Sequence, residues 1–257
     1  MRYFDLLRQI YGYGQEVTSR GLKTLELRNV RLDVDNYNAV SVPVCRDWVD
    51  ISKYLYAEMA WYMSGDRTLT KIMPYSKFWD QIKNHDGTAN SNYGDLVFYR
   101  KNKRNITSFA WAFEQLVKDQ YTRKAIVLYN DRDLFYYDNK DLICNQYQHF
   151  MIRNNTLECT IALRSSDAIY GLTFNMPWWS FVHQQMFLVL KKFYPDLILG
   201  PMVAFISSSH IYENKIPLVR EMISSSEQEY RFLRLSTIVP LSNTFESYHS
   251  QFPEVFK

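Results

Sequence analysis

The chain contains 257 residues, of which 30 are Lys or Arg and 27 are Asp or Glu, so its formal net charge is +3. Apolar residue types make up 47% and charged types 22%, a balance that excludes a disordered chain. So small a net charge does not predict the clustered basic groove of a nucleic-acid-binding protein, and we expect no direct contact with nucleic acid.

Three cysteines stand far apart in the sequence, at Cys45, Cys144 and Cys159. An odd number at wide spacing predicts neither a disulfide framework nor a CxxC metal site, and we expect no metal. Charged side chains occur within the first eight residues, and no apolar run approaches about 18 residues. We therefore expect no secretory signal, no membrane contact and a cytoplasmic location.

The first segments predict a short helix followed by extended chain. Apolar Phe4, Leu7 and Ile10 recur at helical spacing, and the glycines at positions 12 and 14 end this helix. Apolar and polar residues then alternate from Leu22 to Val34, which predicts one or two strands.

A nearly apolar helix follows, through the sequence YLYAEMAWYMS. Asp47 or Ser52 would cap its start, and Gly65 ends it. From Pro74 to Gly94 the chain is rich in loops, with one helical turn around KFWDQIKN.

The second half of the chain mixes both kinds of element. In chain order, the patterns predict a helix at 108–120, a strand at 125–130, two strands within 146–165 around the turn Asn154–Asn155, an amphipathic helix at 178–193 and a strand at 201–213. Helices and strands interleave without a regular βαβ rhythm, and no repeat or linker interrupts them. The pattern favours a single α+β domain over residues 1–257 rather than a doubly wound sheet.

Two residues in apolar surroundings carry reactive groups. Glu58 lies inside the apolar helix, either as an exposed or salt-bridged side chain or as a buried functional carboxylate. Cys144 precedes an apolar run, either as a packed thiol or as a nucleophile, and a nucleophile needs a nearby cation or donor that favours the thiolate.

Polar side chains also gather in the segment LRSSDAIYGLTFN, residues 163–175, between a strand and a helix. Arg164 and Ser165 suit a phosphate, because a guanidinium offers a rigid fork of donors and a hydroxyl adds another. Asn175 offers a donor and an acceptor, as a base edge does. His210 and Tyr212 are two residues apart on a predicted strand, hence on one face. Each signal alone also fits an ordinary loop or core.

Taken in order, these segments resemble the thymidylate synthase family from about Ser19 to Glu213. The matching segments are SRGLKT, AEMAWYMSGD, FWDQI, NSNYG, TRKAIVLYN, the strand after Cys144, RSSDAIYGLTFN and HIY. The last two are the most specific. The resemblance implies a thymidylate synthase-like fold with a large mixed β-sheet packed with helices, and a homodimer formed through one face of that sheet.

The resemblance also implies a role for individual residues. Cys144 would add to C6 of a pyrimidine nucleotide, and the other catalytic positions are Glu58, Asn145 and Tyr93. The implied ligands of the nucleotide's phosphate, base edge and 3′-hydroxyl are Arg20, Arg123, Lys124, Arg164, Ser165, Asn175, His210 and Tyr212, with Arg123 donated across the dimer interface. The implied positions beside the co-substrate, 5,10-methylenetetrahydrofolate, are Asp167, Trp79 and Gly171.

The family contains synthases, which make a methyl group by hydride transfer from the folate, and phage hydroxymethylases, which admit water instead. This sequence departs from the synthase pattern near the site: Ile143-Cys144-Asn145 replaces Pro-Cys-His, Lys124 replaces the second of two arginines, Thr173 replaces a proline and Ile82 a second tryptophan. The final SQFPEVFK does not resemble the tail that seals the folate site. A less sealed site favours attack by water over hydride transfer from the folate, so we expect hydroxymethylation. We also expect a phage enzyme that acts in the host cytoplasm.

Asn175 bears on which base is used. Uracil presents an N3–H donor beside the O4 acceptor, which one amide can match, whereas the cytosine-specific enzymes resemble this motif with Asp in that place. We therefore expect dUMP as substrate. Three alternatives stay open: a thymidylate synthase, a dCMP hydroxymethylase, and a catalytically silent nucleotide-binding or structural dimer partner.

Overall fold

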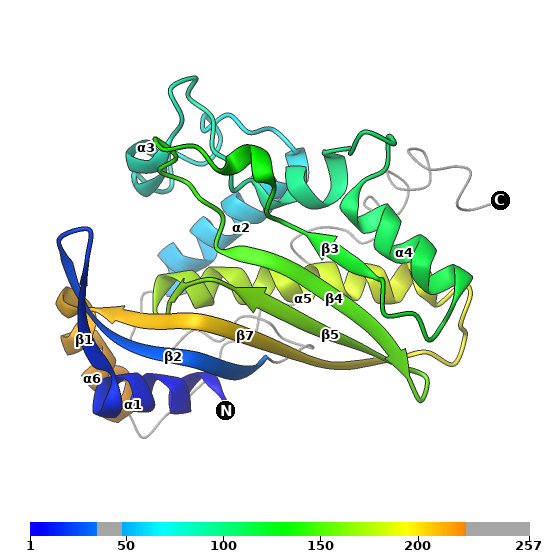
Figure 1. Cartoon of the computed structure of the whole chain (residues 1–257). Coiled ribbons are helices and arrows are strands. Elements are labelled where there is room, and N and C mark those ends of the chain that lie inside the picture. Colours follow the sequence, from blue (N-terminus) through cyan, green and yellow to red (C-terminus); the bar gives the residue numbers. More distant parts are fainter. Residues whose placement is uncertain (35–47, 225–257) are drawn as a thin grey trace.

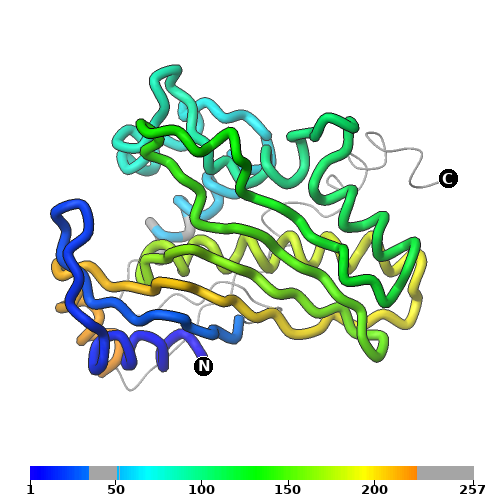
Figure 2. Tube along the Cα trace, in the orientation of Figure 1, coloured from blue at the N-terminus to red at the C-terminus, as the bar shows by residue number. Residues whose placement is uncertain are grey.

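The computed structural model describes residues 1–34 and 48–224 (Figures 1 and 2). Within these ranges the chain forms a seven-stranded sheet in the order β1-β2-β7-β5-β4-β3, with β6 paired to β7 off this path. The strands are β1 (Gln15–Ser19), β2 (Leu22–Val34), β3 (Ile126–Leu128), β4 (Asn145–Arg153), β5 (Thr156–Leu163), β6 (Ser166–Asp167) and β7 (Ile198–Tyr212). β7 runs parallel to β5 and β6, and the other pairs are antiparallel. The predicted α+β class with a large mixed sheet is confirmed.

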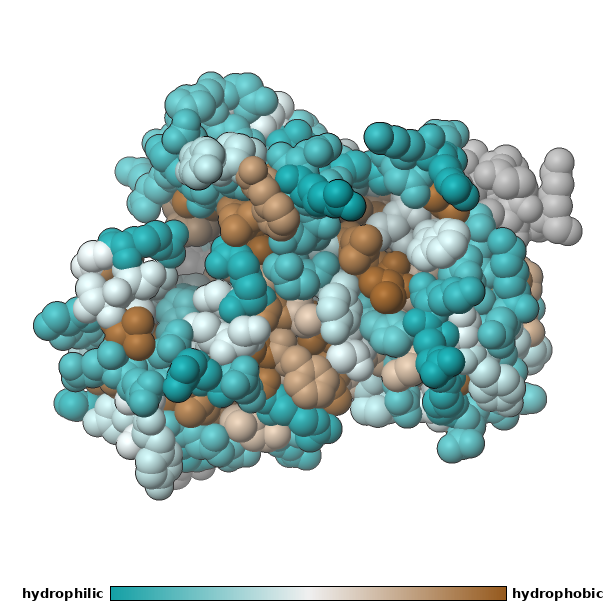
Figure 3. Space-filling model, viewed as in Figure 1, coloured by the Kyte–Doolittle hydropathy of each residue, from teal (hydrophilic) through white to brown (hydrophobic). Residues whose placement is uncertain are grey.

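One face of this sheet is covered by helix and the other is open, as Figure 1 shows with α5 passing behind the strands. On the open face, cross-strand pairing forms a continuous row of Leu128, Tyr147, Ala162, Phe205 and Arg31. Leu128 is 56% and Phe205 49% exposed. Figure 3 looks onto this face and shows apolar side chains gathered over its middle.

The central helix α5 (Tyr170–Leu190) corrects the sequence prediction in two respects. It begins eight residues before Trp178, so the second half of the LRSSDAIYGLTFN segment is helical rather than a connection. It is also not amphipathic, because buried side chains occur on nearly every side of it. The sheet packs against one flank, while α2 (Trp48–Ser64) and α4 (Ser108–Lys118) contact others, so the helix is enclosed.

The other α-helices of the described residues are α1 (Tyr3–Tyr13), α3 (Phe78–Ile82) and α6 (Ile216–Ser224), and single helical turns of other types occur at Asp95–Tyr99, Arg132–Leu134 and Glu213–Lys215. α1 continues through Gly12 and ends at Gly14, whose N–H donates to the Ile10 carbonyl at 2.9 Å. α2 ends at Gly65, whose φ of +63° suits glycine. Ser52 lies inside α2 and is therefore not its cap, and Asp47 lies outside the described residues. Among the described residues, no helix combines the length and apolar character that crossing a bilayer requires.

Two tight hairpins fix the strand register. The predicted turn at Asn154–Asn155 is confirmed, with φ values of +48° and +57°, as a type I′ turn requires. The second turn, Arg20–Gly21, joins β2 to β1, a strand that the sequence patterns did not predict. The consequence for the site is that Arg20 stands at the tip of a hairpin.

Candidate active site

Cys144 stands immediately before β4, half-buried and beside Arg164. The pairing of β4 with β5 brings them together, since the N–H of Arg164 donates to the Cys144 carbonyl at 3.0 Å. The guanidinium of Arg164 holds the preceding residues: Nε donates to the Ile143 carbonyl at 3.1 Å and Nη2 to the Leu142 carbonyl at 2.6 Å. Arg164 is exposed, so its guanidinium also faces solvent.

Charges on both sides act on the thiol of Cys144. Burial raises its pKa, the guanidinium groups of Arg164 and Arg20 lower it, and the carboxylate of Asp141 raises it further. Arg164 thus favours the thiolate, as expected, but burial outweighs it. The pKa of the Cys144 thiol therefore lies above its usual value, which favours the neutral form.

Arg20 lies within electrostatic reach of both Cys144 and His210. It is exposed at the β1–β2 turn. Its charge lowers the pKa of both Cys144 and His210, which places it within electrostatic reach of each. The hairpin thus brings a cation to the Cys144 end of the sheet.

Glu58 is a buried carboxylate, 4% exposed, and not the salt-bridged surface side chain that was the alternative. The hydroxyl of Tyr54 donates to its Oε1 at 2.7 Å, and Tyr62 also hydrogen-bonds to it. Burial raises the pKa of Glu58 to about 7, against the lowering effect of the two tyrosines. Glu58 can therefore take up or release a proton near neutral pH.

Aromatic rings enclose this carboxylate. Trp79 donates from Nε1 to the Tyr54 hydroxyl at 3.1 Å, and the ring of Tyr62 stacks on that of Tyr93 with 5.1 Å between centroids. Burial raises the pKa of Tyr93, and so do the charges of Cys144, Asp141 and Glu58. The structure thus brings Glu58, Tyr93 and Cys144 into one neighbourhood.

Asn145 follows Cys144 and is fully buried. Its Oδ1 accepts a hydrogen bond from the indole Nε1 of Trp179 at 3.2 Å. Because an indole nitrogen only donates, this contact fixes which way the amide points. The Nδ2 donor is buried and has no hydrogen-bond partner among the residues that the structure describes, so it can serve a ligand or an ordered water.

Asp167 and Gly171 shape the start of α5. The two carboxylate oxygens of Asp167 accept from the N–H groups of Ile169 at 2.9 Å and Tyr170 at 3.2 Å. A Cβ added at Gly171 would lie 3.1 Å from Oγ of Ser166, so a side chain there would crowd the turn. The carboxylate is thereby held at the amino end of the central helix.

His210 and Tyr212 lie on one face of β7, as their spacing predicted, with ring centroids 5.1 Å apart. His210 is paired with Asp167 of β6 on one side and with Glu26 of β2 on the other. Burial lowers the pKa of His210, Arg20 lowers it too, and the two carboxylates raise it. The ring therefore sits between two acceptors.

Ser165 and Asn175 are half-buried. Ser165 directly follows Arg164. Asn175 lies in the second turn of α5, next to Phe174, whose ring centroid is 4.5 Å from that of Tyr54. Ser165 is thus next to Arg164 in the chain, and Asn175 is next to the ring that packs against Tyr54.

Arg123 and Lys124 are the two predicted site residues that a single chain does not bring to Cys144. Both are exposed before β3. The backbone of Arg123 hydrogen-bonds to the side chain of His149, which is five residues beyond Cys144 along β4, about 16 Å at strand rise. These cations would need a second copy of the chain to serve the site.

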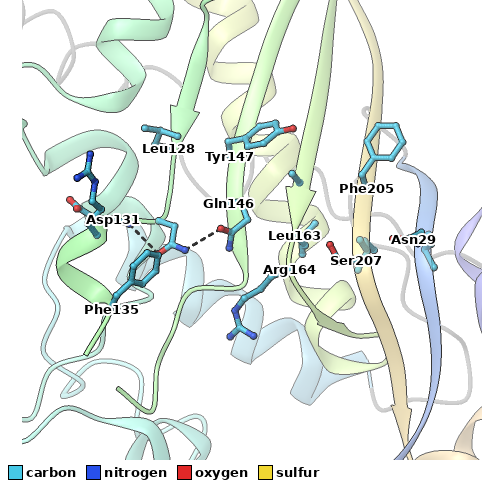
Figure 4. Close-up of a pocket in the computed structure, with 15 residues that line it drawn as sticks. Asn29, Leu128, Asp131, Phe135, Gln146, Tyr147, Leu163, Arg164, Phe205 and Ser207 are labelled. Atoms are coloured by element: carbon cyan, nitrogen blue, oxygen red, sulfur yellow. Dashed lines mark hydrogen bonds between the residues drawn. The ribbon is translucent and has the colours of Figure 1, made fainter. Parts of the chain in front are cut away.

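A hollow of about 680 Å³ opens on the open sheet face beside Arg164 (Figure 4). Figure 4 shows Tyr147, Gln146 and Arg164 at its centre, with Asp131 and Phe135 on one flank and Phe205 and Ser207 on the other. Neither Cys144 nor Glu58 lines it. The hollow therefore belongs to the open face, and Arg164 both lines it and contacts the backbone of Cys144.

Sequence reasoning missed three polar residues of this neighbourhood: Tyr54, Tyr62 and Asp141. The tyrosines were detectable, because positions 54, 58 and 62 recur every four residues on one side of a helix. Asp141 had no such signal, since its contacts come from a distant loop. The described part of the chain holds no group of three or more His, Cys, Asp or Glu side chains placed to bind a metal ion.

Comparison with known proteins adds to this geometry. The family model for thymidylate synthase matches residues 1–252. The deoxycytidylate 5-hydroxymethyltransferase of Enterobacteria phage T6 is 22% identical over 213 residues, covering 79% of this chain and 81% of its own. The deoxyuridylate hydroxymethyltransferase of Bacillus phage SP01 is 26% identical over 183 residues, which span 66% of this chain and 46% of that protein. The solved thermostable thymidylate synthase A of Bacillus subtilis superposes with a TM-score of 0.67 at 17% identity, covering 89% of this chain and 84% of the other.

Proposed function

Because the chain belongs to the thymidylate synthase family and is a one-carbon-transferring enzyme, we propose that it is a deoxyuridylate 5-hydroxymethyltransferase that uses 5,10-methylenetetrahydrofolate. The observation that carries the proposal is that Arg164 lies beside Cys144 at the amino end of β4, while Tyr93 is within electrostatic reach of both Cys144 and Glu58. The proposal includes one catalytic domain over residues 1–257, acting as a homodimer in the cytoplasm of a phage-infected cell.

The nucleotide would be held by charge at one end and by hydrogen bonds along its length. Arg164, Arg20 and Ser165 suit the phosphate, because guanidinium groups bind phosphate oxygens in pairs. His210 and Tyr212 suit the 3′-hydroxyl from their common face of β7. Arg123 and Lys124 of a second copy would complete the phosphate site, docking through the open sheet face.

The residues present also fit a folate. Trp79, Tyr54 and Phe174 form an aromatic wall next to Glu58, suited to a flat bicyclic ring. The Asp167 carboxylate offers acceptors for the N–H groups of a pterin, and Gly171 leaves space beside it. When bound, the folate supplies a one-carbon unit at the oxidation level of formaldehyde.

The chain's own residues account for the proton and electron movements. The Cys144 thiol would give its proton to a water in the site while its sulfur bonds to C6 of uracil, which moves the C5–C6 electron pair toward O4 and makes C5 nucleophilic. Donors near O4, among them the unpartnered Nδ2 of Asn145 acting through water, would stabilise that charge. After C5 has taken up the one-carbon unit, the C5 proton would leave to a base, water would add to the new exocyclic carbon, and the sulfur would leave C6 as the thiolate, which restores the C5–C6 double bond. Glu58, with its pKa of about 7, suits proton exchange with the water that becomes the new hydroxyl.

Two observations favour a hydroxymethyl product from uracil. The relatives from phages T6 and SP01 are named as hydroxymethyltransferases. Their named bases differ, cytosine in T6 and uracil in SP01, and Asn175 supports uracil through its paired donor and acceptor. A thymidylate synthase and a dCMP hydroxymethylase are the alternatives.

Mass spectrometry of the product distinguishes these outcomes. With methylenetetrahydrofolate, we expect dUMP to gain CH2O and dCMP to react poorly. A gain of CH2 with dihydrofolate formation would instead establish a synthase. In parallel, Cys144→Ser should abolish tritium release from 5-³H-dUMP, whereas Cys159→Ser, the buried cysteine away from the site, should retain it. A wild-type chain that releases no tritium, so that Cys144→Ser changes nothing, would favour the silent dimer partner.

A further inference from the structure

Asp141 is the point at which two separate loops meet. Its carboxylate accepts hydrogen bonds from the backbone N–H groups of Asn90 at 2.7 Å and Ser91 at 2.8 Å. The Ser91 hydroxyl lies 2.7 and 2.8 Å from its two oxygens. Asp141 is only 6% exposed, and a buried carboxylate is retained only where donors satisfy it. These donors all come from a segment about 50 residues earlier in the chain.

A second layer of amide contacts fastens the same two loops. The Nδ2 of Asn90 donates to the Tyr136 hydroxyl at 3.0 Å and to Oδ1 of Asn139 at 3.1 Å. Its Oδ1 accepts from Nη2 of Arg67 at 2.9 Å and from Nδ2 of Asn84 at 3.0 Å. The junction is therefore a connected polar network rather than a single contact.

Each of the two loops ends in a residue of the active-site neighbourhood. The first runs from Asn90 and Ser91 to Tyr93, and the second runs from Asp141 to Cys144. Three residues of extended chain span at most about 11 Å, so Asp141 cannot lie far from the thiol. Within residues 1–34 and 48–224, the groups whose charges act on Cys144 are Arg164, Arg20 and Asp141, of which Asp141 is the acid.

We propose that Asp141 is a positioning residue, which sets the placement of Tyr93 relative to Cys144 and supplies the negative charge that opposes Arg164 and Arg20 at the thiol. This inference rests on the proposed function for its effect on turnover. Its effect on the thiol stands independently of which reaction the enzyme performs. Removing the negative charge of Asp141 should favour the thiolate of Cys144. The hydrogen bonds from Asn90 and Ser91 to Asp141 act as a clamp between the two loops, and removing this clamp should slow turnover because Tyr93 is less well placed.

Two variants of the full chain separate the charge from the clamp. Asp141→Asn removes the charge and weakens the clamp, while Ser91→Ala keeps the charge and removes the hydroxyl contacts. Asp138→Asn, an exposed acid of the same loop, is the matched control. The measurements are the pH dependence of Cys144 alkylation by iodoacetamide, followed by peptide mass spectrometry, and kcat for tritium release from dUMP.

We expect Asp141→Asn to move the alkylation profile to lower pH, and both Asp141→Asn and Ser91→Ala to lower kcat about tenfold while Asp138→Asn changes neither. An alkylation profile for folded Asp141→Asn that superimposes on the wild type's overturns the inference, even if Tm falls. If Asp141→Asn does not fold, an unchanged kcat in Ser91→Ala overturns it. A wild-type chain without activity on dUMP would contradict the proposed function and leave the alkylation test valid.

Discussion

Glu58 shows how one side chain combines a stability cost with a chemical use. α2 holds its carboxylate out of water, between Tyr54 and Tyr62, in a helix that is otherwise nearly apolar. Desolvation penalises the ionised form, so the pKa rises to about 7 from a reference value of 4.5. The same shift that destabilises the folded chain above that pH allows the group to exchange protons near neutrality.

The sign of this effect gives a prediction for stability. The folded state binds the Glu58 proton more tightly than the unfolded state does. Proton binding at Glu58 therefore stabilises the fold fully below about pH 4.5, and this stabilisation is lost as the pH rises to about 7. Glu58→Gln stays neutral, so its unfolding free energy relative to wild type should increase by about 3 kcal/mol between pH 4.5 and pH 8. Urea denaturation at both pH values measures this. The exposed Glu16→Gln serves as control, and a difference independent of pH would contradict the account.

Asn175 is the residue at which base specificity can be tested. An amide matches the N3–H and O4 of uracil, whereas a carboxylate prefers a partner with donors. Asn175→Asp should therefore raise the ratio of kcat/KM for dCMP over dUMP by about tenfold or more, since an unmatched polar group costs more than 1 kcal/mol. Steady-state kinetics with both nucleotides give the ratio. Unchanged selectivity would remove the argument for uracil.

At the scale of elements, the site depends on how closely the Tyr93 loop approaches α2. Gly94 packs directly onto the backbone of Tyr62, where an added Cβ would lie 1.6 Å from the carbonyl oxygen. Its φ of −64° is open to any residue, so glycine is required for space and not for conformation. The stacking of Tyr93 on Tyr62 follows from this contact.

Gly94→Ala should therefore separate the Tyr93 loop from α2. We expect a loss of about 2–4 kcal/mol of stability and at least a tenfold fall in kcat, because backbone atoms must move. Gly12→Ala is the matched control: nothing lies within 4 Å of its added Cβ, and it occupies an exposed helix position. That control should gain about 0.5–1 kcal/mol. Thermal unfolding and turnover of both variants provide the comparison, and equal effects would contradict this packing argument.

At the scale of the whole molecule, the open sheet face and the positions of Arg123 and Lys124 both favour pairing with a second copy of the chain. The face carries a row of exposed apolar side chains, and Arg123 and Lys124 lie away from Cys144 within one chain. A two-fold pairing through the face would bury the apolar row and bring the cations of one copy to the site of the other. The dimer stays a prediction.

Mixing two inactive variants tests this arrangement. Cys144→Ser lacks the nucleophile and Arg123→Ala lacks the donated cation, so a mixed dimer would contain one site with both groups intact. After joint refolding of equal amounts, we expect about a quarter of wild-type activity, because half the dimers are mixed and each has one working site of two. No recovery above the sum of the separate variants would show that Arg123 acts within its own chain or not at all.

Several features could be predicted from sequence because they depend on local or ordered signals. The hairpin at Asn154–Asn155, the strand ending in His210 and Tyr212, and the helix end at Gly65 follow from turn chemistry and side-chain period. The family could be predicted from the order of its motifs, since eight short segments in one sequence constrain each other more than any one does.

Other features were decided by the tertiary structure alone. α5 begins earlier than its pattern suggested and is buried nearly all round, because burial depends on which elements pack against it and not on its own periodicity. The raised pKa of Glu58, the balance of charges on Cys144 and the Asp141 junction come from residues distant in the chain, which only folding places together. The sequence by itself thus determined most of the elements, though not β1 or the start of α5, and the types of reactive group. The three-dimensional packing decided the charge states of those groups, since these depend on desolvation and on neighbours that no local pattern encodes.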